Sequence, residues 1–263
     1  MDVPDENPYE RIAELYDLEH ASFRTDIDLL LSFADIVGDP ILEMGCGSGR
    51  IAVPLARAGF DVTGIDRSPA MLSRARSAVR DADVSERVTL VELDMAEAQE
   101  APGGPFGLVI FSLNALMHLT TAAHQLAALK AAFAALDPKG QLIVDTMNPT
   151  PLNLTQLEAG QVLEGSWRRP DGSTVDKWSH REVSPATQLI ETILWYEHIS
   201  HDGRTKRTRT QFPQRYVHAS ELELMLTLAG FSETRLYGSY DLDPYEDDSE
   251  RLFVTSEATP SAS

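Results

Sequence analysis

Cysteine, basic residues and long apolar runs are all scarce in this sequence. Cys46 is the only cysteine, so no disulfide can form within the chain, and a lone thiol suits a reducing compartment. No run approaches the roughly 18 consecutive apolar residues of a membrane span. The acidic amino end carries no apolar run, which argues against a signal peptide. We therefore expect a cytoplasmic protein.

The shortage of positive charge bears on possible partners. The chain has 22 Lys and Arg against 41 Asp and Glu, a net charge of −19 at pH 7. Such a field repels phosphate backbones and anionic lipids, so we expect neither nucleic acid nor a membrane as a partner. In residues 160–216 the two signs nearly balance, which predicts a separate structural unit there.

The pattern of apolar residues divides the chain into segments. Residues 8–37 read as a helix, and short apolar runs then alternate with helical stretches up to residue 146. This alternation predicts a parallel sheet covered on both faces. The runs are nearly continuous, as in strands buried on both sides. Strands are expected at 41–44, 62–65, 88–91, 108–111 and 142–144, and helices at 51–58, 69–79 and 124–136.

From residue 161 the pattern changes to tight turns. Turn signals at Asp171-Gly172, 184–187 and 201–203 predict about four antiparallel strands. Ser220 and Glu223 then form a capping-box pattern that opens a helix, which Gly230 ends, and strands are expected near 234–240 and 252–255. The predicted units are a helical lid (1–37), an α/β core (38–150), an antiparallel insertion (151–216) and a segment that completes the core sheet (217–258).

A glycine-rich turn is the strongest local motif. The strand Ile41–Met44 runs into Gly45-Cys46-Gly47-Ser48-Gly49 and then into a helix, a context typical of a nucleotide site. A dinucleotide fingerprint would place its third glycine one residue later, at Arg50. Glu43, just before the turn, is a poor neighbour for phosphate and a good one for an ammonium group. The expected ligand is a zwitterion attached to a nucleoside.

The motif from Glu43 to Gly49 resembles that of the class I S-adenosylmethionine-dependent methyltransferases. The resemblance covers residues 9–150 well and 219–256 more loosely. It implies a doubly wound α/β fold with a seven-stranded, mostly parallel sheet in the order 3-2-1-4-5-7-6, the last strand reversed. It also implies S-adenosylmethionine as cofactor and S-adenosylhomocysteine as product.

The same resemblance implies which residues hold the cofactor. Glu43 would organise the methionine part, above the turn of Gly45, Cys46 and Gly47. Asp66 would accept both ribose hydroxyls, which a carboxylate can do; a role as helix cap is the alternative, although Ser68 is better placed for it. Asp94 would receive the adenine amino group. Further contacts with the adenine and the sulfonium end would come from Arg67, Met71, Met95 and Phe111, of which Met71 could equally be core.

Acceptor candidates lie after the fourth strand and near the amino end. Asn114 and His118 are expected to face the acceptor, and His118 is the most obvious base because its ordinary pKa is nearest neutrality. A hydrogen-bonded histidine that closes the loop is the alternative. Tyr9 and Tyr16, seven residues apart, share a helix face. By resemblance they belong to a lid, with Tyr9 near the acceptor and Tyr16 a catalytic candidate at the sulfonium; an ordinary amphipathic helix explains them equally.

The insertion holds all three tryptophans of the chain. A flat, partly apolar acceptor between aromatic faces would make Trp167, Trp195 and Tyr216 substrate contacts. The alternative is that these rings fill the small sheet. The histidines of this region lack metal-ligand spacing, so no metal is expected, and the strand edges could pair two subunits as a homodimer.

These observations predict methyl transfer by in-line displacement to a small-molecule acceptor at nitrogen, oxygen or carbon. An amine, an indole or another partly aromatic natural-product scaffold fits best, which suggests secondary metabolism. The Asn/Asp-Pro-Pro-aromatic motif of amide and base N-methyltransferases is missing after the fourth strand, which counts against nucleic-acid or glutamine acceptors. Two alternatives stay open, a cofactor-binding sensor or scaffold without turnover and a methyltransferase acting on a protein side chain.

Overall fold

Two β-sheets organise the computed structural model, which describes residues 7–258. The larger sheet has seven strands in the order β10-β11-β5-β4-β1-β2-β3, with β11 antiparallel to β5. Counted from the β3 edge this is the predicted order 3-2-1-4-5-7-6, which is confirmed together with the reversed last strand. Its strands are β1 (Ile41–Met44), β2 (Val62–Asp66), β3 (Val88–Glu92), β4 (Phe106–Phe111), β5 (Leu136–Met147), β10 (Ser232–Tyr237) and β11 (Arg251–Glu257).

Helices cover both faces of the larger sheet, because successive strand side chains point to opposite faces. On one face Ile41 and Leu108 pack with α2 (Thr25–Val37) and α3 (Ala52–Arg57), and α4 (Pro69–Asp81) lies beside α3. On the other face Leu42 and Val109 pack with α5 (Ala122–Ala135), α7 (Ala219–Ala229) and the 3₁₀ turn η1 (Met95–Glu100). A second 3₁₀ turn, η2 (Ala115–His118), follows β4.

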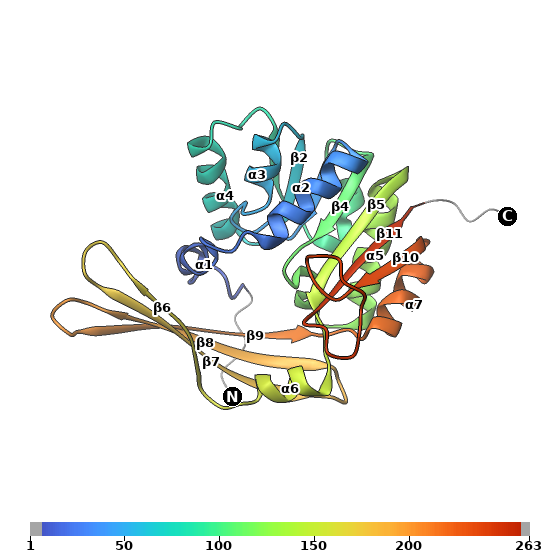
Figure 1. Ribbon diagram of the computed structural model, residues 1–263. Coiled ribbons are helices and arrows are strands. Elements are labelled where there is room, and N and C mark those ends of the chain that lie inside the picture. The colour runs from blue at the N-terminus through green and yellow to red at the C-terminus, as the bar shows by residue number, and fades with distance from the viewer. Residues whose placement is uncertain (1–6, 259–263) are drawn as a thin grey trace.

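The smaller sheet is antiparallel, in the order β6-β7-β8-β9, and its turns fall where the sequence predicted them. Its strands are β6 (Val162–Arg168), β7 (Thr174–Ser184), β8 (Leu189–Ile199) and β9 (Thr205–Arg215), preceded by the short helix α6 (Pro151–Leu157). It extends as a long ribbon beneath the larger sheet, with α1 (Ala13–His20) between the two (Figure 1). The inner face of β8 packs against α1 through Leu194 and Tyr196.

Two local predictions were wrong, and one helix was not predicted. The helix expected over 8–37 is two helices, because Ile12 and Leu15 pack on the smaller sheet whereas Ile27 and Leu30 pack on the larger one, and the chain turns between them. The helix expected to open at Ser220 begins at Ala219 and has no side-chain cap, although Gly230 ends it as predicted. Helix α6 was missed, despite the Thr150 hydroxyl that caps it and the Pro151 that starts it.

A buried polar network joins the two sheets. The Arg215 guanidinium at the end of β9 donates to Gln125 of α5 at 2.6 Å, to Gln188 at 2.8 Å and to Glu221 of α7 at 2.6 Å. Gln125 in turn donates to the carbonyl oxygen of Leu116 in η2. This network fixes the smaller sheet against the helices of the larger one. Within residues 7–258, no helix combines the length and the apolarity needed to cross a membrane.

Candidate active site

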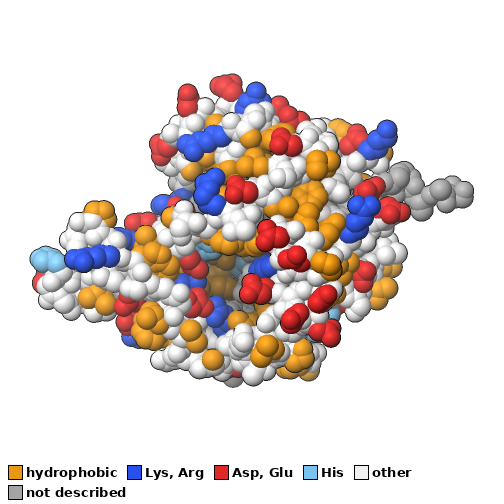
Figure 2. Space-filling view, in the orientation of Figure 1, with side chains coloured by type: hydrophobic (Ala, Val, Ile, Leu, Met, Phe, Trp, Pro, Cys, Tyr) orange, Lys and Arg blue, Asp and Glu red, His pale blue; other side chains and the backbone are white. Residues whose placement is uncertain are grey.

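A cavity of about 530 Å³ lies where the two sheets meet. Its wall combines the segment 7–20, the carboxyl ends of β1, β2 and β4, and the inner face of β7, β8 and β9. Figure 2 shows the hollow near the centre of one face, with acidic and basic side chains around it. Ligands of open α/β sheets bind at the carboxyl ends of the strands, so the cavity lies where the sequence places the site.

The glycine-rich turn forms one end of the cavity. Gly45 and Gly47 have φ of +75° and +54°, a region that side chains disfavour. A Cβ on Gly47 would lie 3.2 Å from the Met71 methyl group, so glycine keeps the backbone open to a ligand. Cys46 is buried against β2, where a Cβ on Gly64 would lie 2.9 Å from both its Cβ and its Sγ. Gly64 therefore makes the room in which the turn is seated.

Asp66, at the end of β2, braces this turn. One carboxylate oxygen accepts the backbone N–H of Gly47 at 2.8 Å and the other accepts that of Ser68 at 2.8 Å. Burial raises the pKa of Asp66, against these hydrogen bonds, which lower it. Ser68 caps α4, since its hydroxyl accepts from the Met71 N–H. Each oxygen of Asp66 therefore keeps a free lone pair for a ligand hydroxyl.

Glu43 is the least satisfied acid of the site. Its side chain is 1% exposed, and its Oε2 has no hydrogen-bond partner among the described residues. Burial raises its pKa to about 8, although Arg50 opposes the shift. A buried carboxylate oxygen without a donor is costly, so this end of the cavity is suited to a cationic or hydrogen-bond-donating group.

Arg50 stands beside Glu43 and is a residue that the sequence reasoning missed. Its guanidinium pairs with the buried Asp26 of α2 through two hydrogen bonds, at 2.9 and 2.5 Å, and lines the cavity. A cation and an acid in one wall fit the carboxylate and the ammonium of an amino acid. The sequence did carry a signal for this residue, because an arginine directly follows the glycine-rich turn. Position 50 was considered only as the place where a dinucleotide motif would have its third glycine.

At the end of β3, the residues that would border an adenine are only partly brought together. Arg67, Met71 and Met95 line the cavity. Asp94 does not; one oxygen accepts the Ala96 N–H at 2.9 Å and the other lies 3.4 Å from the Arg67 guanidinium. Glu43 and Asp66 thus both line the cavity. Asp94 lies outside the lining and is linked to it by its contact with the Arg67 guanidinium.

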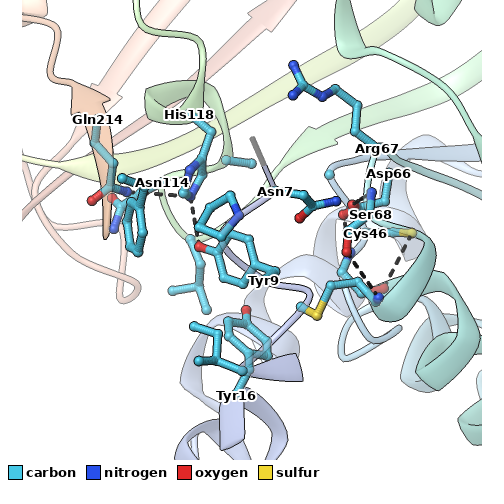
Figure 3. A pocket seen from close by; sticks show the side chains of 18 of the residues that line it. Asn7, Tyr9, Tyr16, Cys46, Asp66, Arg67, Ser68, Asn114, His118 and Gln214 are labelled. Carbon is cyan, nitrogen blue, oxygen red and sulfur yellow. Dashed lines mark hydrogen bonds between the residues drawn. The ribbon is translucent and has the colours of Figure 1, made fainter. Parts of the chain in front are cut away.

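Tyr9 and His118 meet at the other end of the cavity. The Tyr9 hydroxyl lies 3.0 Å from His118 Nε2, and the Gln214 amide reaches the same nitrogen at 3.5 Å. Figure 3 shows these three side chains together, across the cavity from Asp66 and Ser68. Burial lowers the pKa of His118 to about 4, and Arg67 adds to the shift. The imidazole is therefore neutral near pH 7.

Tyr16 lies between the two ends. Its ring stacks on His20 at 4.1 Å between centroids, and the Tyr9 ring meets it edge-on at 6.0 Å. Burial raises the pKa of the Tyr16 hydroxyl to about 12. The two tyrosine rings contact each other, but the prediction that they share a helix face was wrong, because Tyr9 lies ahead of α1 rather than within it.

An ionic cluster on the inner face of β7 and β8 was also missed. Lys177 pairs with Glu19 of α1 and with Glu164 of β6, the latter at 2.7 Å. The Tyr196 hydroxyl donates to Glu19 at 3.1 Å. Beside the cluster, the Thr192 hydroxyl is buried and has no partner among the described residues. In the sequence Lys177 and Thr192 each have a polar neighbour, Asp176 and Glu191, so the pattern does not tell which face is inside.

Four predicted aromatic contacts lie outside the cavity wall. Phe111 is fully buried in the core under the sheet, and the neighbouring Ser112 lines the cavity instead. Trp167 packs in the cluster under α1, and Trp195 stacks on Trp178 on the outer face of the smaller sheet. Tyr216 is buried with Met117 and Ile190. These rings pack within or against the sheets. For the three rings of the insertion, this is the alternative given by the sequence, in which the rings fill the small sheet.

Asn114 lines the cavity, but its side chain is partly committed elsewhere. Its Oδ1 accepts the Met147 N–H at 2.7 Å, so only the amide NH₂ group is left to face a ligand. Among the described residues, no group of three or more His, Cys, Asp or Glu side chains could hold a metal ion.

Comparison with known proteins agrees with this geometry. Residues 41–140 match the family described as a methyltransferase domain. YqeM of Bacillus subtilis (strain 168), which is named as a methyltransferase, is 28% identical over 225 residues, 82% of this chain and 83% of that protein. The chain spans 56% and 53% of the length of two further curated relatives.

Solved structures share the fold along nearly the whole chain. The CcbJ methyltransferase from Streptomyces caelestis matches with a TM-score of 0.76 and 23% identity, over 97% of this chain and 99% of that one. CalS10, described as an amino pentose methyltransferase from Micromonospora echinaspora and solved with S-adenosylmethionine bound, matches with a TM-score of 0.70 and 20% identity, over 96% and 99%. The predicted fold class is thereby confirmed.

Proposed function

We propose that the chain, whose residues 41–140 match a methyltransferase domain, is a methyltransferase that depends on S-adenosylmethionine and that it methylates the amine nitrogen of a small polar acceptor. The observation that carries the proposal is the chemistry of the acceptor end. There His118 and Tyr9 are uncharged and bonded to each other, and Lys177 is paired with two carboxylates. Among the described residues that line this end, none is a strong base.

The residues of the cofactor end fit the cofactor by their own chemistry. The unpartnered Oε2 of Glu43 suits its ammonium group, and the Arg50 guanidinium suits its carboxylate. Asp66 has lone pairs left for the two ribose hydroxyls. Arg67, Met71 and Met95 would border the adenine, and Asp94 would act on it only through its contact with Arg67. When bound, the cofactor supplies an electrophilic methyl group on a positively charged sulfur.

The lack of a strong base decides between acceptor atoms. An alcohol must lose its proton to become a good nucleophile, and an imidazole with a pKa near 4 is too weak to take it. A neutral amine already carries its lone pair, so binding it in the unprotonated form is enough. The chain then needs only to hold the acceptor in line and to exclude water, which is how positioned groups lower such barriers.

The polar groups in the cavity wall favour a hydrophilic acceptor over an indole. The tryptophans lie outside the cavity wall, whereas Lys177, Tyr196 and the unpartnered Thr192 hydroxyl line it. A hydroxyl group on the acceptor would satisfy Thr192, because a buried hydroxyl without a partner is costly. The description of CalS10 as an amino pentose methyltransferase names the same class of molecule, a sugar that carries an amine.

A matched panel tests the proposal. Purified protein is incubated with methyl-labelled S-adenosylmethionine and an amino sugar, the same sugar with a hydroxyl in place of the amine, an indole and a phenol. We expect label on the amino sugar alone, with a rate that rises with pH as the acceptor ammonium loses its proton. Methylation of the hydroxyl, indole or phenol but not the amine would refute the acceptor class.

Two further arms separate the other functions. A protein extract treated with the labelled cofactor reveals a protein acceptor, which would be labelled in place of the sugar amine. Tight cofactor binding without turnover on any acceptor would favour a sensor or scaffold. Size-exclusion chromatography of the same preparation tests the proposed homodimer.

A further inference from the structure

The turn after β4 has an unusual backbone. Leu113 and Asn114 have φ of +42° and +66°, two consecutive residues other than glycine in the left-handed region. Asparagine tolerates this region, but leucine is strained there, and such strain persists only where the surroundings hold it. Both residues line the cavity, and η2 follows at once and ends at His118. The shape of this turn therefore sets the acceptor end.

Asp145 of β5 holds the turn from behind. Its Oδ2 accepts the Leu113 N–H at 3.0 Å, and its backbone carbonyl accepts the Asn114 N–H at 2.9 Å. Both amide groups of the strained pair thus bond to one residue. Asp145 is 2% exposed and is not among the described residues that line the cavity.

Two side chains from the other end of the chain hold Asp145 in turn. The Arg251 guanidinium of β11 donates to Oδ1 through Nε at 2.9 Å and Nη2 at 2.5 Å, and the Tyr240 hydroxyl donates to Oδ2 at 3.0 Å. The carboxylate accepts four hydrogen bonds in all, which matches the lone pairs of its two oxygens. An asparagine offers one acceptor oxygen and could not accept them all.

We propose that Asp145 is a positioning residue of the methyl transfer, with Arg251 and Tyr240 as its supports. The three keep the Leu113–Asn114 turn in its strained form and so fix the acceptor end relative to the cofactor end. The inference rests on the proposed function insofar as the acceptor lies beside this turn. It predicts that loosening Asp145 costs rate and leaves cofactor affinity unchanged.

A matched pair of tyrosine variants tests this. Tyr240→Phe removes one hydrogen bond to Asp145. The control is Tyr245→Phe, because Tyr245 lies on the same loop and its hydroxyl donates at 2.7 Å to Asn148, which has no hydrogen bond to the turn. Amide hydrogen exchange of Leu113 and Asn114 is measured without cofactor, and kcat, acceptor KM and cofactor Kd follow.

We expect Tyr240→Phe to speed exchange of the two amides about fivefold, as losing one hydrogen bond implies. The kcat should fall about tenfold, because a small displacement of the acceptor is enough. The cofactor Kd should stay within about twofold, and Tyr245→Phe should change none of these. Asp145→Asn should act in the same direction and lower kcat by about 100-fold.

Several outcomes would overturn the proposal. These are unchanged exchange in Tyr240→Phe, an equal loss of kcat in both tyrosine variants, or a loss confined to cofactor Kd. If Asp145→Asn does not fold, the tyrosine pair still decides. If the wild-type protein methylates an alcohol or an indole, the proposed acceptor class is wrong, and the same kcat comparison with that acceptor still tests Asp145.

Discussion

The two ends of the cavity pair their polar groups in opposite ways. At the cofactor end Glu43 leaves one oxygen bare, and Asp66 bonds only to backbone N–H groups that follow it within two residues or face it across the turn. At the acceptor end Lys177 and Tyr196 meet Glu19, which lies 158 and 177 residues away in sequence. The cofactor end is therefore formed by residues that lie closer together in sequence, and it leaves polar atoms free for its ligand. The acceptor end is formed by polar and charged residues that lie far apart in sequence and bond to each other.

Asp66→Ala should give the largest effect and confine it to the cofactor end. The substitution removes the acceptor of two backbone N–H groups and the carboxylate that we propose for the ribose hydroxyls, so cofactor Kd should rise about 100-fold or more. Calorimetry measures the change. Asp94→Ala is the control, since Asp94 does not line the cavity, and it should cost about tenfold at most. Equal losses of cofactor affinity in the two variants would contradict the different roles given to Asp66 and Asp94.

Lys177→Met probes the acceptor end in the same way. It leaves Glu19 without the cation it pairs with here and Glu164 with Arg181 alone, which should destabilise the fold by about 2 kcal/mol and raise acceptor KM about tenfold. Cofactor Kd should stay within about twofold. The control is Lys206→Met, on the exposed part of β9, which should be neutral. Cofactor binding that falls along with acceptor binding would show that the two ends are not separable.

Glu43 makes the cofactor end sensitive to pH. With a pKa of about 8, its carboxyl is mostly protonated near pH 7 until an ammonium group favours the charged form. Cofactor affinity should therefore rise about tenfold between pH 6 and 7.5, with proton release on binding. Glu43→Gln should bind more weakly and with little pH dependence. A wild-type affinity that is flat over this range would contradict the role given to Glu43.

The raised pKa of Glu43 also makes the stability of the cofactor-free protein depend on pH, but in the opposite direction: stability falls with rising pH, whereas cofactor affinity rises. A folded pKa raised from 4.5 to about 8 means that the folded state holds a proton which the unfolded state releases. The stability that this proton contributes is complete below pH 4.5 and is lost as the pH rises through about 8. Without cofactor, Glu43→Gln should therefore have a higher Tm than the wild type at pH 8, and nearly the same Tm at pH 4.5.

His118→Gln should give the smallest effect. Because the pKa of His118 is lowered to about 4, its titration lies below the range in which kcat is measured. Glutamine can still hydrogen-bond to Tyr9, so kcat should fall less than about tenfold and the pH profile from 6 to 9 should keep its shape. If the variant removes an inflection near neutral pH, His118 is a general base after all.

Much of the fold and of the cofactor end could be predicted from the sequence. Continuous apolar runs, turn dipeptides and the glycine-rich turn are local signals, and they gave the alternation of strands and helices, the antiparallel sheet and the places of Glu43 and Asp66, whereas the strand order came from the family resemblance. The positions of these two acids follow from local structure, since each stands at or next to the end of a strand. Their position needs no knowledge of the rest of the chain.

The charged residues of the acceptor end could not be predicted in this way, although Tyr9, Asn114 and His118, which were predicted there, do line the cavity. Which face of β7 turns inward depends on where α1 packs, so Lys177 looks like any charged strand residue until Glu19 is placed against it. Trp167 and Trp195 were predicted to contact the substrate for the same reason, because a large ring can pack equally well on either face of a sheet. Asp145 and Arg251 are 106 residues apart, and nothing in the sequence joins them.

The seating of Cys46 against Gly64 restricts how this protein can be changed. An added methyl group at position 64 would collide with the cysteine side chain, whose backbone is fixed by the turn. The two positions therefore cannot vary independently in a mutant library. Even an alanine in the middle of β2 would need glycine at position 46 and a small shift of Leu90, whose Cδ2 would lie 3.1 Å from the new Cβ, so libraries that diversify this strand should mutate positions 46 and 64 together.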